Sequence, residues 1–260
     1  MNRVRVKSEF DRYVSAYDLS DPKIALKVAH TYRVAELCER IGASAGVDDP
    51  NLAWLCGMLH DIGRFEQVRR YGTFIDAQSV DHAQFGADLL FNGGLINRFA
   101  SEDDWSCPED FDLLETAIRS HNLFRLPDDL TPRERSYCDV LRDADKLDIF
   151  RAISETPLED IYNLTTKELR DSAVGASAKA AFDGRHALLR KLKTEPIDHL
   201  VGHICLFFEL VYPLSCKIAF EEGYLGKLLE FESDNPDTRA WFAHMREVLQ
   251  GDDGVSSGLV

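Results

Sequence analysis

Basic residues are scarce in this chain relative to acidic ones. Its 260 residues include 30 Lys and Arg against 45 Asp and Glu, which gives a formal net charge of −15 at pH 7. Proteins that bind nucleic acid without sequence preference use Lys and Arg to neutralise phosphates, and anionic membranes attract basic surfaces in the same way. The composition therefore argues against a nucleic-acid polymer or a membrane surface as partner.

Long apolar runs are missing as well. The most apolar stretch, residues 204–216, contains Glu209 and Pro213 and is shorter than the about 20 residues that a membrane-spanning helix needs. Residues 1–10 carry several charges and lack the apolar centre of a signal peptide. The six cysteines form no CxxC pair, which favours small buried apolar residues over disulfides or a zinc ribbon. We expect a cytoplasmic protein.

Alternating patterns typical of β-strands are also rare. Only Arg3–Lys7 resembles a short strand, and there is no tight hairpin signal or internal repeat. Helical periodicity extends over nearly the whole chain, and 45% apolar residues are enough for a core. The sequence predicts an all-α fold, with a functional helical core over residues 1–150. A helical extension over residues 151–260 is expected to pack on this core as part of one globular unit.

Capping signals set the expected ends of the first two helices of the core. The first is expected to start after Asp21-Pro22 and to end near Ala45-Gly46, with Leu26 and His30 on its inward face. The second is expected to begin after Asp49 and to run through the His60-Asp61 pair to a stop at Gly63, followed by a loop.

Three more helices are expected after that loop. Ser79 is the predicted N-cap of the third, which ends at residues 92–94. The fourth carries an apolar stripe that ends in His121. The fifth opens with a capping box formed by Thr131 and Glu134.

Polar residues interrupt the apolar faces of these helices. They are His30, His60 with Asp61, His82, His121 and Asp145. One inward His is usually a hydrogen-bonded core residue. Burying the whole set costs several kcal/mol for each ionised group unless the groups are paired or bind a metal. Neutral His nitrogens and carboxylate oxygens suit Fe, Mn, Co, Ni or Zn, so the set predicts a site for divalent transition metals.

The order of these residues resembles the HD-domain superfamily of metal-dependent phosphohydrolases. The segments that carry the resemblance are LCGMLHDIGRFE around His60 and Asp61, DHAQFGADLLF around His82, IRSHN around His121 and DADKLD around Asp145. It covers about residues 20–150. The resemblance implies a helical bundle with the site in its middle.

The resemblance also implies a role for each residue. His30, His60, Asp61 and Asp145 would hold a first metal, and His82 and His121 would hold a second one. Asp61 would act in catalysis by bridging the two metals, because its two oxygens can each take one cation. A hydroxide activated by the metals would attack phosphorus in line. The implied activity is hydrolysis of a nucleotide or another small phosphate ester, with one or two divalent metals as cofactor.

Two cations near these residues are further candidates for catalysis. Arg64 lies about one helical turn after His60, and Lys146 follows Asp145. Either side chain can bind a substrate phosphate, although each can equally pair with a nearby acid, as Lys146 could with Asp143. The expected partner is a small anionic substrate.

Two other functions remain open. Some HD-fold proteins with the same order of six ligands are di-iron oxygenases, and the ligand set alone does not separate them from hydrolases. A non-catalytic nucleotide sensor is the other alternative. Its usual sign would be a lost ligand, and none of the six is missing. A homo-oligomer also remains open.

Overall fold

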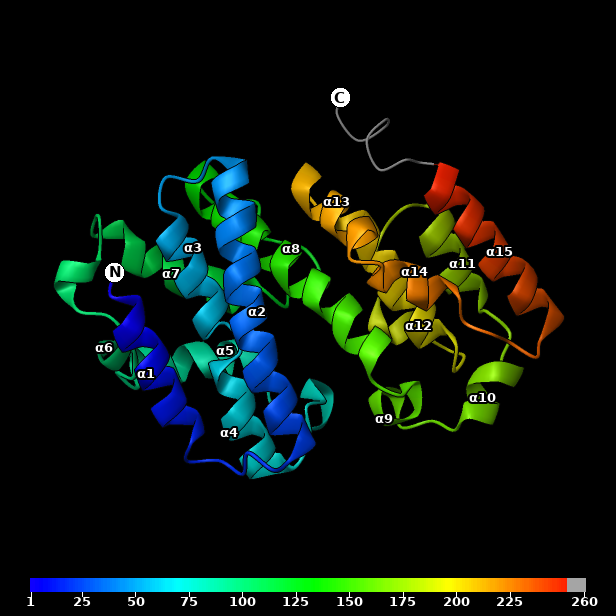
Figure 1. The fold of residues 1–260 in the computed structure, drawn as a ribbon, viewed down its shortest axis with the longest axis horizontal. Coiled ribbons are helices and arrows are strands. Elements are labelled where there is room, and N and C mark those ends of the chain that lie inside the picture. Colours follow the sequence, from blue (N-terminus) through cyan, green and yellow to red (C-terminus); the bar gives the residue numbers. More distant parts are fainter. Residues whose placement is uncertain (252–260) are drawn as a thin grey trace. The chain divides into compact units, whose positions relative to one another are not determined.

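The computed structural model describes residues 1–251 of the chain, except for the side chains of Asp160 and Gln250. All regular elements in this range are helical, which confirms the predicted all-α class (Figure 1). No described helix has the length and apolarity to cross a membrane. The chain divides into two compact units, Met1–Asp145 and Lys146–Val260. The expected boundary at residue 150, and the packing of the extension on the core, stay predictions.

The first unit is built from α1 to α7 and the beginning of α8. Their bounds are α1 (Arg3–Val14), α2 (Pro22–Ala45), α3 (Pro50–Leu59), α4 (Ile62–Tyr71), α5 (His82–Ala87), α6 (Ile96–Phe99), α7 (Glu109–Ser120) and α8 (Pro132–Glu155). Two 3-10 helices (Asp76–Gln78 and Glu102–Asp104) and a π-helical segment (Asp88–Asn92) lie between them. The long helix α2 packs along α3, and α4 and α7 both pack against α5.

Side-chain caps hold the starts of three helices, and those at Asp49 and Thr131 were predicted. Asp21 accepts a hydrogen bond from the backbone N–H of Lys23 at the start of α2. Asp49 does the same for α3, with Asn51 as the donor. Thr131 and Glu134 form the predicted reciprocal box at the start of α8. These local bonds satisfy N–H groups that the first turn of a helix otherwise leaves without a partner.

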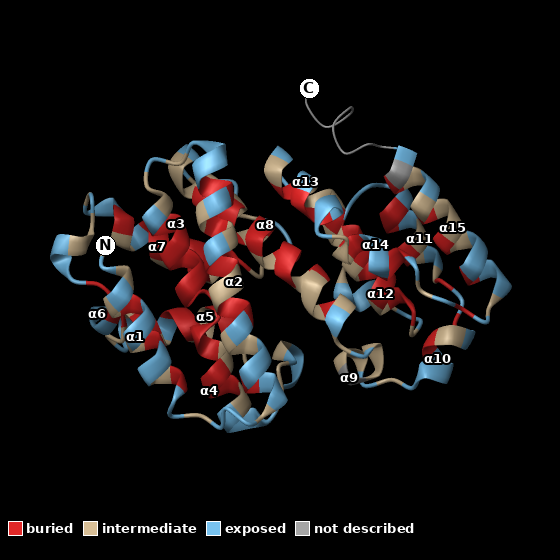
Figure 2. Ribbon diagram, viewed as in Figure 1, coloured by how far each residue is buried: buried red, intermediate tan, exposed pale blue. Residues whose placement is uncertain are grey.

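Helix α3 forms the centre of the first unit. All residues from Leu52 to Leu59 are buried, as Figure 2 shows along this helix. Gly57 lets α2 approach closely, because a Cβ atom at this position would lie 2.5 Å from the Cα of Ala35. The C-terminal end of α3, which carries His60, is thereby fixed inside the bundle against α2.

Two predictions about local structure are wrong. Arg3–Lys7 is the first part of α1 and not a strand, because Val6, Phe10 and Val14 repeat at helical spacing and are buried together. Gly63 does not end a helix but lies in the first turn of α4. A Cβ atom at Gly63 would meet the backbone of α5 at 2.5 Å, so a glycine is needed for close packing of the two helices.

Two smaller details also differ from expectation. Asp81, and not Ser79, is the N-cap of α5, where it accepts bonds from the backbone of Ala83 and Gln84. Ser79 instead accepts a bond from the Gln67 side chain. Leu26 is 37% exposed although its spacing places it with the inward stripe of α2, because in this turn Ile24 is the apolar side chain that is buried.

The second unit consists of short helices after the end of α8. They are α9 (Leu158–Tyr162), α10 (Thr166–Asp171), α11 (Ala176–Asp183), α12 (Asp198–Ile204), α13 (Pro213–Glu221), α14 (Tyr224–Leu229) and α15 (Pro236–Gly251), with 3-10 helices at Arg190–Leu192 and Cys205–Glu209. Helix α12 contacts both α11 and α14. The prediction of further helices after the core is confirmed.

Candidate metal centre

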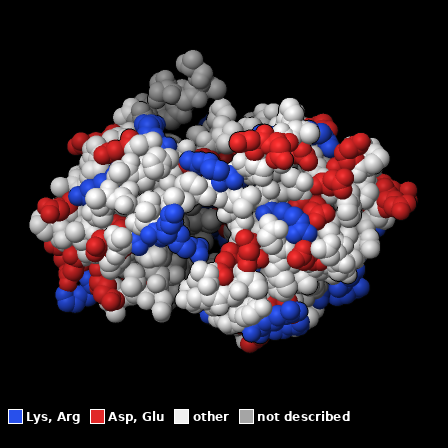
Figure 3. All heavy atoms as spheres, turned by 180° about the vertical axis from the view of Figure 1, so that it is seen from behind, with Lys and Arg blue, Asp and Glu red and all other residues white. Residues whose placement is uncertain are grey.

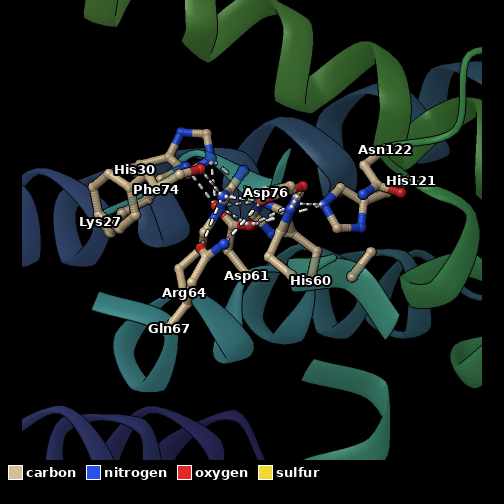
Figure 4. Close-up of polar contacts among 12 residues, drawn as sticks. Lys27, His30, His60, Asp61, Arg64, Gln67, Phe74, Asp76, His121 and Asn122 are labelled. Carbon is tan, nitrogen blue, oxygen red and sulfur yellow. Dashed lines mark hydrogen bonds and ion pairs between the residues drawn. The ribbon is translucent and has the colours of Figure 1, made fainter. Parts of the chain in front are cut away.

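The structure brings all six predicted metal ligands together inside the first unit. Figure 4 labels His30, His60, Asp61 and His121 of this set. His30 comes from α2, His60 from the end of α3, Asp61 from the junction of α3 and α4, His82 from the start of α5, His121 from the end of α7 and Asp145 from α8. The four imidazoles and Asp61 are at most 5% exposed, and the Asp145 side chain is 19% exposed. The inward placement expected from helical periodicity is therefore correct.

One group of ligand atoms surrounds one oxygen of Asp61. His30 Nε2 lies 3.2 Å from both His60 Nε2 and Asp145 Oδ1. Asp61 Oδ2 is 3.5 Å from each of these two imidazole nitrogens. The side chains of His30, His60 and Asp145 thus converge with Asp61 Oδ2 on one point.

A second group surrounds the other oxygen of the same carboxylate. His82 Nε2 and His121 Nε2 are 3.0 Å apart. Asp61 Oδ1 lies 3.4 Å from the first of these nitrogens and 3.8 Å from the second. The carboxylate of Asp61 therefore stands between two sets of nitrogen and oxygen atoms, with one oxygen facing each set.

Hydrogen bonds from Nδ1 in three of the imidazoles show that their Nε2 atom carries the lone pair that can bind a cation. His60 Nδ1 donates to the carbonyl of Gly57 at 2.8 Å, and His121 Nδ1 donates to that of Ile118 at 2.7 Å. His82 Nδ1 donates to Asp76 at 2.7 Å. A neutral imidazole that donates through Nδ1 carries its lone pair on Nε2. Lone pairs that face one another repel unless a cation lies between them, so this donor set fits metal ions.

Burial keeps these imidazoles neutral at physiological pH. It lowers the pKa of His60 below its usual value, and it lowers the pKa of both His82 and His121 to about 4. Burial acts to raise the pKa of Asp61, but the Lys27 ammonium, His60, His30 and Arg64 together outweigh it and hold this pKa well below its usual range. Neutral imidazoles beside an ionised carboxylate are the protonation state that metal ligands require.

Lys27 is a residue of the site that the sequence analysis did not identify. It lies on α2, and its Nζ atom is 2.5 Å from Asp61 Oδ2. Its side chain is 17% exposed. The signal was present in the sequence, because a residue three positions before His30 lies on the same face of a helix.

Asp76 was missed as well. It lies in a 3-10 helix before α5 and accepts hydrogen bonds from His82, Arg64 and Gln67 at 2.7, 2.8 and 2.9 Å. Such an acceptor fixes the orientation and tautomer of a metal-binding imidazole. The loop carries no periodicity from which this contact could be inferred.

The two predicted catalytic cations differ in what the structure says of them. Arg64 Nη1 donates to Asp76 and, at 2.7 Å, to the carbonyl of Phe74. Of the two expected alternatives, this atom therefore pairs with an acid. Arg64 Nε is buried 3.5 Å from Asp61 Oδ1 and has no hydrogen-bond partner among the described residues. Lys146 is buried and begins the second unit, and its role stays a prediction.

Comparison with known proteins agrees with the geometry. Residues 28–153 match the model of the HD domain family, and this range includes all six converging residues. No curated protein and no solved structure matched the chain. The resemblance noted in the sequence is confirmed: residues 28–153 of this chain form an HD domain.

Proposed function

We propose that this chain is a metal-dependent phosphohydrolase that acts on a nucleotide or another small phosphate ester. HD domains generally belong to metal-dependent phosphohydrolases. The observation that carries the proposal is the division of the Asp61 carboxylate, in which Oδ2 faces His30 and His60 while Oδ1 faces His82 and His121. One carboxylate between two donor sets is the arrangement of a two-metal site.

The proposed ligands follow from these distances. His30, His60, Asp145 and Asp61 Oδ2 would hold one ion, and His82, His121 and Asp61 Oδ1 would hold the other. The mixture of imidazole nitrogen and carboxylate oxygen suits Fe, Mn, Co, Ni or Zn. When bound, such ions supply an activated water for attack on phosphorus and positive charge for its oxygens.

The surrounding side chains prepare the site for an anion. Arg64 is held through its Nη1 atom by Asp76 and the carbonyl of Phe74, and its Nε–H, which has no hydrogen-bond partner among the described residues, would donate to a phosphate oxygen. Lys27 adds a second positive charge next to Asp61. Two divalent ions would contribute four positive charges against the two ligand carboxylates, so the pocket would be electropositive inside an acidic protein.

A small substrate fits the surface better than a polymer does. On the face drawn in Figure 3, Lys and Arg side chains lie in small groups between acidic ones. A nucleic-acid polymer is usually bound along a continuous basic stripe. This pattern and the net charge of −15 support a small phosphate ester that enters the helical bundle.

The test is a panel of phosphate esters assayed with protein that has been purified without oxygen and loaded with Mn, Fe, Co, Ni or Zn. We expect release of inorganic phosphate from at least one ester, and loss of both metal and turnover in Asp61→Ala. Asp103→Ala, a change at an exposed acid, is the control and should retain both. The proposal fails if no ester is hydrolysed with any metal while oxygen is consumed and a mixed-valent di-iron signal appears. That result would favour the oxygenase alternative.

A further inference from the structure

A cavity of about 470 Å³ lies in the first unit, apart from the metal centre. It is formed by α1, the residues just after it, α4, Leu89 and Arg98, and Figure 1 shows α1 beside α4. None of the described residues that line it is one of the six proposed metal ligands. Its volume is that of a site for a small molecule.

Four arginines surround this cavity. They are Arg12, Arg69, Arg70 and Arg98, whose side chains are between 39% and 68% exposed. Glu9 pairs with Arg12 and Arg98 at 3.0 and 2.9 Å, and Glu66 pairs with Arg69 and Arg70 at 2.5 Å each.

These pairs leave the cavity positively charged. Four guanidiniums face two carboxylates, so two positive charges remain in a protein with a net charge of −15. A guanidinium offers five N–H donors, and each pair with a carboxylate uses only one or two of them. The cluster therefore keeps the donors and the charge to bind an added anion.

The part of the cavity lining without charge is apolar and aromatic. It is formed by Tyr13, Ala16, Tyr17 and Leu89. The two tyrosine rings lie 5.4 Å apart, and the guanidinium of Arg69 lies 5.3 Å from the centre of the Tyr17 ring. Such a wall gains free energy by covering a flat or apolar group, which inorganic phosphate lacks.

We propose that this cavity binds a small organic phosphate that is not at the metal centre. The phosphate lies between the arginines, which hold it through bidentate hydrogen bonds. Its aromatic or apolar body lies on Tyr13, Tyr17 and Leu89. A phosphate monoester carries a charge of about −1.5 to −2 at pH 7, which matches the local surplus of two positive charges.

Helix α4 joins this cavity to the metal centre. Its first turn carries Arg64, beside Asp61, and its last turn carries Arg69 and Arg70. Tyr13 also donates a hydrogen bond of 3.2 Å to the carbonyl of Ile62, the residue after Asp61. The ligand would therefore lie on the same helix as the reaction site but contact different residues.

The test uses the metal-loaded full chain and adenosine 5′-O-thiomonophosphate, whose thiophosphate resists hydrolysis. Arginines are modified with phenylglyoxal at increasing probe concentration, and the modified positions are identified by mass spectrometry. We expect the probe to protect Arg12, Arg70 and Arg98, while Arg40, an exposed arginine of α2, reacts as before. Adenosine and inorganic phosphate should each protect at least about tenfold less well, because each supplies only one half of the contacts.

A double substitution measures the contribution of the arginines. Arg12→Ala with Arg98→Ala leaves the pairs of buried Glu66 intact, and it should raise the probe concentration that half-protects Arg70 by about tenfold or more. Arg40→Ala is the matched control and should leave this concentration unchanged. Protection of Arg64 alone, no protection, or equal protection by inorganic phosphate would each overturn the proposal. None of these outcomes depends on whether the chain hydrolyses a phosphate ester.

Discussion

The contact between Asp76 and His82 allows a sharp prediction, because it supports one proposed metal and not the other. Asp76→Asn keeps the size of the side chain and an acceptor oxygen but removes the charge that His82 Nδ1 and Arg64 contact at 2.7 and 2.8 Å. A hydrogen bond to a charged group contributes about 1.5–3 kcal/mol, against about 0.5–1.5 kcal/mol for a neutral one. The midpoints of these ranges differ by about 1.25 kcal/mol, close to the about 1.4 kcal/mol that corresponds to a tenfold change in affinity.

The assay is a competition between the protein and a chelator of known affinity. We expect the ion at His82 and His121 to bind at least about tenfold more weakly in Asp76→Asn, which is the usual effect of removing such a support. The ion at His30 and His60 should bind as in the unsubstituted chain. Asp103→Asn, at an exposed acid, is the control. If the ion at His82 and His121 binds to Asp76→Asn as tightly as to the unsubstituted chain, the role given to this carboxylate is refuted.

Two further predictions concern charge at the site. Lys27→Met leaves buried Asp61 without its ammonium partner, so the metal-free protein should lose roughly 3 kcal/mol of stability, and added metal should raise Tm more than in the unsubstituted chain. An equal rise of Tm on metal addition in Lys27→Met and in the unsubstituted chain would contradict this. The pKa of His82 and His121 is lowered to about 4 in the folded protein, so on acidification the unfolded chain takes up these protons first. Urea unfolding of the metal-free protein should therefore show a free energy of unfolding that falls from pH 6.5 towards pH 4, by up to about 3 kcal/mol for one group. Constant stability over this range would show that these imidazoles are not buried and neutral.

Much of the site could be predicted from the sequence because helix starts and helical spacing depend on residues that are close together in the chain. The Asp21-Pro22 pair and the capping box of Thr131 and Glu134 indicated where α2 and α8 start, and helical periodicity then placed His30 and Asp145 on inward faces. The order of the motifs, compared with a known family, supplied what periodicity cannot, namely that these faces meet at one point.

The remaining features depend on contacts between distant parts of the chain. A glycine that ends a helix and one that lets two helices touch look alike in a sequence, so only the approach of α5 shows what Gly63 does. Asp76 lies in a turn without periodicity, and its contact with His82 follows from the path of the loop. Lys27 is different, since its helical spacing from His30 was visible and only its partner Asp61 was not.

The most direct test of the two-metal centre is an anomalous scattering map from crystals of the metal-loaded protein. The account predicts two peaks about 3.5–4 Å apart, one on each side of the Asp61 carboxylate. One peak should contact His30, and the other should contact His82. A single peak, or a second peak that does not touch Asp61, would contradict the account.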